Sequence, residues 1–156
     1  MSEIRFSTFP RTSAPNQHVL AVVEVFQRHE HEISTVLLDK GLKSDQVLEI
    51  LGADLQALGF QVEASKSMDD KIVRPVFFGE NGQPSRVYQI DAFHPEHGSA
   101  LEVEAGRAWM GNAIYRDLIQ AAVMVGVNSL FLAVPNTYRY KSNGKDTTSK
   151  DYENTL

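Results

Sequence analysis

Three acidic side chains stand out near the middle of the chain because they lie in otherwise apolar, strand-like segments. Asp91 belongs to the segment 88–93, and Glu102 and Glu104 belong to the segment 100–105. Successive side chains of a β-strand point to opposite faces, so Glu102 and Glu104 should share one face. A short turn joins the two segments, and we therefore expect the three carboxylates to converge.

Converging carboxylates imply a particular chemistry. Such groups repel one another unless protons or cations neutralise them, and a Glu in an apolar strand is costly without a partner. A hard divalent ion such as Mg²⁺ or Mn²⁺ solves both problems because it prefers oxygen ligands. It can also polarise a phosphodiester and activate a water molecule. The alternative interpretation is the solvated face of an exposed antiparallel strand, which often carries Glu.

A polar stripe follows the carboxylates. Asn112, Arg116 and Gln120 recur at helical spacing in a helix expected over 112–125, and Arg107 precedes that helix. Side chains of these types bind phosphate, so the four residues are candidates for contact with DNA. The alternative is that they form the wet face of a surface helix.

The surrounding pattern predicts a mixed α/β domain. Apolar periodicity indicates helices over 16–34, 44–58 and 112–125, and strands over 60–64, 72–78, 86–93, 100–105 and 129–134. Pro75 implies an edge position or a bulge in its strand. Hairpin-linked strands followed by a helical crossover predict a mixed central sheet of four or five strands, flanked by helices on both sides.

Composition fits one domain over 16–135, preceded by an irregular lead-in over 1–15. The polar segment 136–156 is expected to be a loop or disordered tail. The chain has 156 residues, no cysteine and a net charge of −5, which argues against a protein that coats nucleic acid by bulk attraction. No apolar run is long enough for a membrane span and no secretory signal is recognisable, so we expect a cytoplasmic protein.

The order of these features resembles the active-site signature of the PD-(D/E)XK, or restriction endonuclease-like, nuclease superfamily. The resemblance rests on Asp91, on Glu102-Val103-Glu104, and on the helix and short strand that follow. The third motif position is usually Lys in that superfamily, and Glu104 resembles the variant of the BamHI and BglII group. The wider run over 17–140, including Glu102-Val103-Glu104-Ala105-Gly106-Arg107, is similar to a group of uncharacterised bacterial proteins placed in the same superfamily.

This resemblance implies a metal-dependent endonuclease that hydrolyses DNA, commonly as a homodimer. Asp91 and Glu102 would bind Mg²⁺ or Mn²⁺ together with the carbonyl of Val103, and Glu104 would ligate the metal or orient the attacking water. Glu49, with Glu32 as second choice, is the candidate for a further acidic ligand from an upstream helix, or else an ordinary surface carboxylate.

Glu104 departs from the superfamily pattern because a carboxylate cannot stabilise developing negative charge as Lys does. A non-cutting domain that binds nucleic acid or protein is therefore an alternative, and a purely structural domain with surface carboxylates is another. Basic residues that could form a rim for DNA are Lys66, Lys71, Arg74, Arg139, Lys141, Lys145 and Lys150.

The histidines do not form a recognisable motif. His29 and His31 lack zinc-site spacing and fit an exposed helix end. His94 and His97 fall in the turn between the two acidic strands, where we expect a role in the turn itself.

Overall fold

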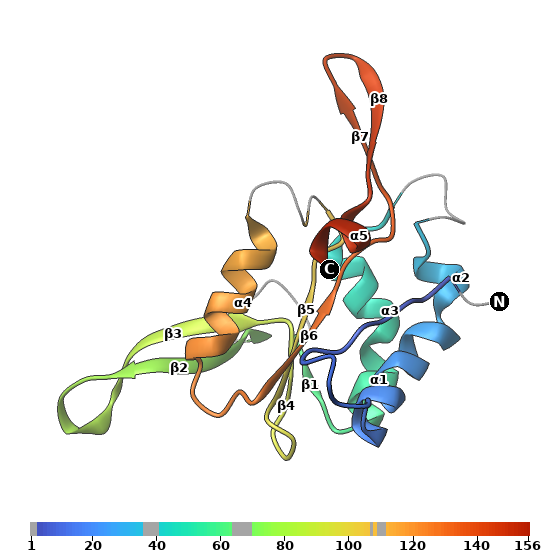
Figure 1. The fold of residues 1–156 in the computed structure, drawn as a ribbon. Coiled ribbons are helices and arrows are strands. Elements are labelled where there is room, and N and C mark those ends of the chain that lie inside the picture. Colours follow the sequence, from blue (N-terminus) through green and yellow to red (C-terminus); the bar gives the residue numbers. More distant parts are fainter. Residues whose placement is uncertain (1–2, 36–40, 64–69, 107, 109–111) are drawn as a thin grey trace.

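The computed structural model describes residues 3–35, 41–63, 70–106, 108 and 112–156, and at its centre lies a four-stranded mixed sheet (Figure 1). In spatial order the strands are β1 (Gln61–Val62), β4 (Ala92–His94), β5 (Ser99–Val103) and β6 (Ser129–Ala133). Strand β4 is antiparallel to both β1 and β5, whereas β6 is parallel to β5. Parallel neighbours need a crossover, and α4 (Ala113–Val123) supplies it. The predicted mixed α/β class is confirmed.

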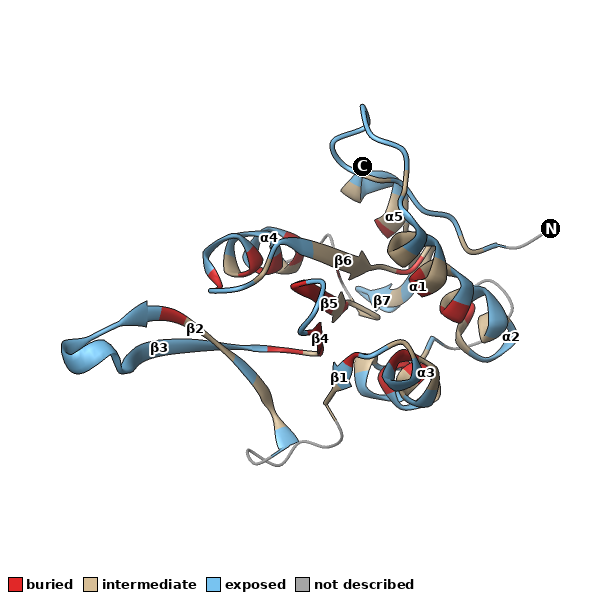
Figure 2. Ribbon diagram, turned by 90° about the horizontal axis from the view of Figure 1, so that it is seen from below, coloured by how far each residue is buried: buried red, intermediate tan, exposed pale blue. Residues whose placement is uncertain are grey.

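Helices cover both faces of this sheet (Figure 2). On one face pack α1 (Gln17–Arg28) and α3 (Ser44–Ala57), and on the other lies α4. The segment expected as one helix over 16–34 is α1 followed by the short α2 (Glu30–Ile33). Within the described residues, no helix is long and apolar enough to cross a membrane.

Alternation along β5 decides which side chains reach each face. Leu101 and Val103 are buried in the core beneath α1 and α3. Ala100 belongs to a second core on the opposite face, together with Phe93 and Met124. Glu102 must therefore point to the α4 face.

A long two-stranded ribbon projects from the central sheet (Figure 2). It consists of β2 (Ile72–Phe78) and β3 (Pro84–Ile90), joined through the 3-10 turn η2 (Glu80–Gly82). The pairing shifts register after Pro75, so of the two alternatives expected there, an edge position or a bulge, the bulge is observed.

The expected strand 86–93 is two strands. Strand β3 ends at Ile90 and β4 begins at Ala92. The chain bends at Asp91 as it leaves the ribbon and enters the central sheet. The pattern of apolar residues continues through the bend, which is why it predicted one strand.

The expectation of a loop or disordered tail over 136–156 is wrong. This segment forms the hairpin β7 (Tyr138–Ser142) and β8 (Lys145–Ser149) and then α5 (Asp151–Thr155). Asn143 and Gly144 have φ values of 51° and 76°, as a tight two-residue hairpin turn requires. Asp151 is fully buried and accepts a hydrogen bond from the backbone N–H of Ala108 at 3.1 Å. That contact ties the end of the chain to the body of the domain.

The described part of the lead-in, residues 3–15, contains no helix or strand. It nevertheless contacts the C-terminal part of the chain. Arg5 donates to Asn136 Oδ1 at 3.0 Å, and its guanidinium lies 4.6 Å from the ring centre of Tyr152.

Candidate metal centre

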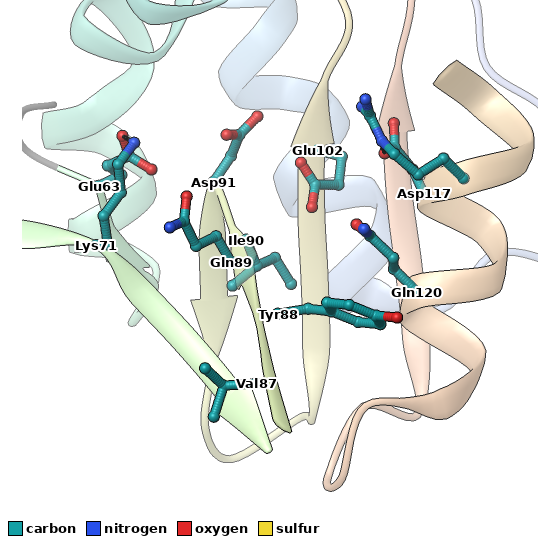
Figure 3. Close-up of a pocket in the computed structure, with 11 residues that line it drawn as sticks. Glu63, Lys71, Val87, Tyr88, Gln89, Ile90, Asp91, Glu102, Asp117 and Gln120 are labelled. Atoms are coloured by element: carbon teal, nitrogen blue, oxygen red, sulfur yellow. Dashed lines mark hydrogen bonds and ion pairs between the residues drawn. The ribbon is translucent and has the colours of Figure 1, made fainter. Parts of the chain in front are cut away.

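An acidic pocket of about 430 Å³ opens on the α4 face of the sheet (Figure 3). Its walls come from the residue after β1, the residue before β2, β3, the bend at Asp91, β5 and α4. Carboxyl groups from four separate segments line it, with a lysine, an arginine and two glutamines among its other polar groups: Glu63, Asp91, Glu102, Asp117, Lys71, Arg116, Gln89 and Gln120.

Asp91 and Glu102 meet as the sequence predicts. The bend at Asp91 lets its Oδ2 accept a hydrogen bond from the backbone N–H of Val103 at 2.8 Å. That bond holds Asp91 beside β5, whose Glu102 side chain extends into the same pocket (Figure 3). Val103 thus contributes its N–H to the site, and a role for its carbonyl stays a prediction.

Asp117 is the acidic residue that sequence reasoning missed. It lies on α4 with only 2% of its surface exposed. Its Oδ1 accepts from Arg116 Nε at 2.9 Å, but its buried Oδ2 has no hydrogen-bond partner in the described part of the chain. An unpaired buried carboxylate oxygen is costly, and a cation is one means of satisfying it.

Glu104 does not line the pocket itself but contacts Arg116, which does. Its Oε1 accepts from Arg116 Nη2 at 2.9 Å, so Arg116 bridges Glu104 and Asp117. The structure thus gathers Asp91, Glu102, Asp117 and Glu104 into one continuous acidic group, with Arg116 as a countercharge on its outer side.

A second ion pair closes the other side of the pocket. Glu63 and Lys71 contact each other, and their side chains are only 11% and 18% exposed. The backbone N–H of Glu63 donates to the carbonyl of Asp91 at 2.9 Å, which connects this pair to the bend. Lys71, expected in a basic rim, therefore brings a cationic group into the pocket itself.

Burial and mutual repulsion raise the pKa of three acidic side chains, those of Asp91, Glu102 and Glu104. Burial, followed by the carboxylates of Asp91 and Asp117, raises the pKa of Glu102 to about 9. Burial and the neighbouring Asp117 raise the pKa of Glu104 to about 7, although Arg116 opposes this shift. Burial also raises the pKa of Asp91, against the effect of the Val103 N–H. Without a cation the group therefore holds protons at neutral pH.

These shifts predict how stability depends on pH. Because the folded state raises the pKa of Glu102 from 4.5 to about 9, it binds a proton more tightly than the unfolded state, and stability falls as the pH rises between these values. We expect the Tm of Glu102→Gln to match that of wild type at pH 4 in EDTA, below the unfolded-state pKa of 4.5. At pH 9 its Tm should be higher by at least about 3 °C, since 1 kcal/mol corresponds to roughly 2–4 °C at this size. Thermal melts followed by circular dichroism measure this; parallel pH profiles for the two proteins would contradict it.

The remaining predicted site residues separate into two groups. Gln120, like Arg116, lines the pocket. Asn112 does not: it is exposed, with a φ of 63°, and its carbonyl accepts the Arg116 N–H at the start of α4. Arg107 lies outside the described residues.

Glu49 is not part of the pocket, and its proposed role as upstream ligand is corrected. It is exposed on α3, which packs against the opposite face of the sheet. Glu32 is also elsewhere, because it accepts from His29. Asp117 and Glu63 supply the additional carboxylates instead.

A signal for Asp117 was present in the sequence. It lies three residues after Ile114 and four before Ala121, and both of these are buried. An acid at that spacing falls on the apolar face of an amphipathic helix, where it needs a partner. Glu63 gave no comparable signal, because β1 has only two residues.

Comparison with known proteins assigns the chain to no family. No family model, curated protein or solved structure matches the chain. The functional interpretation therefore depends on the geometry and chemistry of the acidic pocket.

Proposed function

We propose that this protein is a metal-dependent endonuclease that hydrolyses DNA phosphodiester bonds and has a restriction endonuclease-like fold. The observation that carries the proposal is the meeting of Asp91, Glu102 and Asp117 at one pocket, where Asp117 Oδ2 is buried without a partner. Clustered acids such as Asp91, Glu102 and Glu104, whose pKa values are all raised, are typical of a functional site rather than of a solvated strand face.

The donor set fits a hard divalent cation. All the candidate side-chain ligands are carboxylate oxygens, which suit Mg²⁺ or Mn²⁺. Asp91, Glu102 and Asp117 would hold the ion, with the Val103 carbonyl and Glu104 as further ligands. A bound ion would polarise the phosphodiester and lower the pKa of an attacking water.

The other polar residues have roles that follow from their positions. Lys71 supplies the positive charge that Glu104 cannot supply at its motif position, and it would stabilise negative charge developing on the phosphate. Gln120 and Gln89 can donate to phosphate oxygens from opposite sides of the pocket (Figure 3). Glu104, with a pKa near 7, can accept a proton from water at neutral pH. A homodimer would present two such pockets to the two DNA strands.

A cleavage experiment tests this function. Purified wild-type protein would be incubated with supercoiled plasmid and with labelled oligonucleotides, in Mn²⁺, in Mg²⁺ and in EDTA. We expect cutting that requires the ion and that falls strongly in Glu104→Gln. Equal cutting by wild type and this variant would indicate a contaminating nuclease.

A second candidate is a domain that binds nucleic acid or protein without cutting. It is favoured by Arg116, which already places a countercharge between Glu104 and Asp117. Retention of DNA by wild type without cleavage in either ion, in a mobility-shift measurement, would support this candidate over the endonuclease.

A further inference from the structure

Three histidines from distant parts of the chain meet at the end of the β4–β5 hairpin where the turn lies. His18 belongs to α1, His94 ends β4, and His97 lies in the turn that follows. The ring centres of His18 and His97 are 4.0 Å apart, and His94 lies 5.1 Å from His18 and 4.6 Å from His97. One nitrogen from each ring can be chosen so that all three lie within 4.8 Å of one another.

We propose that His18, His94 and His97 form a binding site for Zn²⁺, or a similar borderline metal ion, that clamps α1 to the β4–β5 turn. Imidazole nitrogen suits zinc, copper and nickel, whereas Mg²⁺ prefers oxygen. The site therefore differs in ligand chemistry from the acidic pocket.

The hydrogen bonds of two rings prepare them as ligands. His94 Nε2 lies 2.8 Å from the carbonyl oxygen of Leu58, and since a carbonyl can only accept, Nε2 carries the hydrogen. The lone pair of the neutral ring is then on Nδ1, which accepts the backbone N–H of His97 at 3.3 Å and would exchange this long hydrogen bond for the metal ion. His18 Nε2 lies 3.1 Å from Ser99 Oγ, which lies 2.9 Å from Ser129 Oγ; a hydroxyl oxygen can accept from Nε2, and the lone pair of His18 is then on Nδ1. Metal-binding histidines usually have such a partner on the second nitrogen.

The surroundings hold the first two rings in place. His94 is 4% exposed and packs over Gly59, where an added Cβ would lie 2.7 Å from His94 Nε2. Phe60 stacks on His18 with ring centres 5.7 Å apart, and Phe131 meets the same ring edge-on. Burial, followed by the nearby His97 and His94, lowers the pKa of His18 to about 4, which is consistent with a neutral ring.

Of the three proposed ligands, His97 is the one whose side chain can change position. Nitrogens around tetrahedral zinc lie roughly 3.3 Å apart, given bonds of about 2.0–2.1 Å, so nitrogens that lie within 4.8 Å of one another must approach by up to about 1.5 Å. His97 is exposed in the turn and can make this movement without disturbing the core. Its exposure also leaves a fourth position open to water.

The histidine site is separate from the acidic pocket. His94 pairs with Ser99, three residues before Glu102 on β5, which corresponds to roughly 10 Å along the strand. His94 also alternates with Phe93 and so faces α1 and α3, whereas Glu102 faces α4. Figure 1 shows the β4–β5 turn and the beginning of α1 at the same end of the sheet.

Zinc titration of untagged full-length protein tests the site. We expect wild type to bind Zn²⁺ with a rise in Tm, and Co²⁺ to give the visible absorption of a tetrahedral site. His97→Asn should bind Zn²⁺ at least about 10-fold more weakly, and this exposed substitution leaves the core intact. The matched control is His31→Asn, which replaces an exposed histidine on α2.

The outcomes separate this proposal from the endonuclease. Asp91→Asn should leave Zn²⁺ affinity unchanged, whatever its effect on DNA cleavage. Equal Zn²⁺ affinity in wild type and His97→Asn, or the absence of any Zn²⁺-dependent change in Tm, would overturn the proposal. Loss of affinity in Asp91→Asn but not in His97→Asn would assign the ion to the acidic pocket and would also overturn it.

Discussion

Replacing Asp91 with Asn should lower Mn²⁺-dependent DNA cleavage by at least about 100-fold. Loss of groups that only orient a metal ligand typically costs about 10–100-fold in affinity or activity, and Asp91 is expected to touch the ion itself. The substitution preserves size and lets the Val103 N–H keep an oxygen acceptor. Cleavage rates at saturating Mn²⁺, measured on a plasmid substrate, give the effect directly.

The matched control for this substitution is Glu49→Gln. It removes one negative charge from an exposed position on the opposite face of the sheet. We expect its cleavage rate to lie within about twofold of wild type, since exposed substitutions away from a site have little effect. A rate that falls equally in both variants would mean that net charge, not the pocket, governs cleavage, and Asp91 would lose its assigned role.

Lys71→Gln should lower the cleavage rate by about 100-fold while leaving Mn²⁺ affinity within a few-fold of wild type. Removal of one donor that stabilises transition-state charge costs on the order of 10²–10³ in rate. The ion pair with Glu63 places Lys71 in the pocket, and Gln can still donate a hydrogen bond to Glu63. The split between rate and metal affinity distinguishes a role in chemistry from a role in binding the ion.

Two further variants make this prediction sharper. Lys71→Arg keeps the positive charge and should therefore recover part of the cleavage rate lost in Lys71→Gln. If a folding defect caused the slow cleavage by Lys71→Gln, the Tm of that variant would also be lower. Lys43→Gln removes a lysine from an exposed position just before α3, which packs on the opposite face of the sheet, and should cut at nearly the wild-type rate. If Lys71→Gln cuts as fast as Lys43→Gln, the positive charge needed for catalysis must come from elsewhere.

Much of the fold could be predicted because burial is strongly periodic here. Strand β2 has the bounds that its apolar residues predicted, and its bulge follows Pro75. Leu101 and Val103 lie in the core, so alternation along the strand places the side chain of Glu102 on the opposite face of the sheet. The face of the sheet to which a strand residue points depends only on local backbone geometry, so it can be predicted from the spacing of residues in the sequence.

Features that depend on distant parts of the chain were not predictable in the same way. The segment 136–156 is polar, so composition favoured disorder, yet Asp151 is buried through its bond to the N–H of Ala108. The Asn143-Gly144 pair is a local signal for a tight turn between two strands. The resemblance to the nuclease superfamily implies an acid from an upstream helix and so favours Glu49, but that helix packs on the other face of the sheet.

Mn²⁺ titration calorimetry, repeated in two buffers that differ in ionisation enthalpy, is the most direct measurement of whether the acidic side chains share one cation. Near pH 7.5 we predict that Mn²⁺ binding releases a proton, because Glu102 with a pKa of about 9 must lose it to become a ligand. We also predict affinity lowered at least about 10-fold in Asp117→Asn. Mn²⁺ binding that releases no proton and is unchanged in both Asp91→Asn and Asp117→Asn would contradict a shared metal centre.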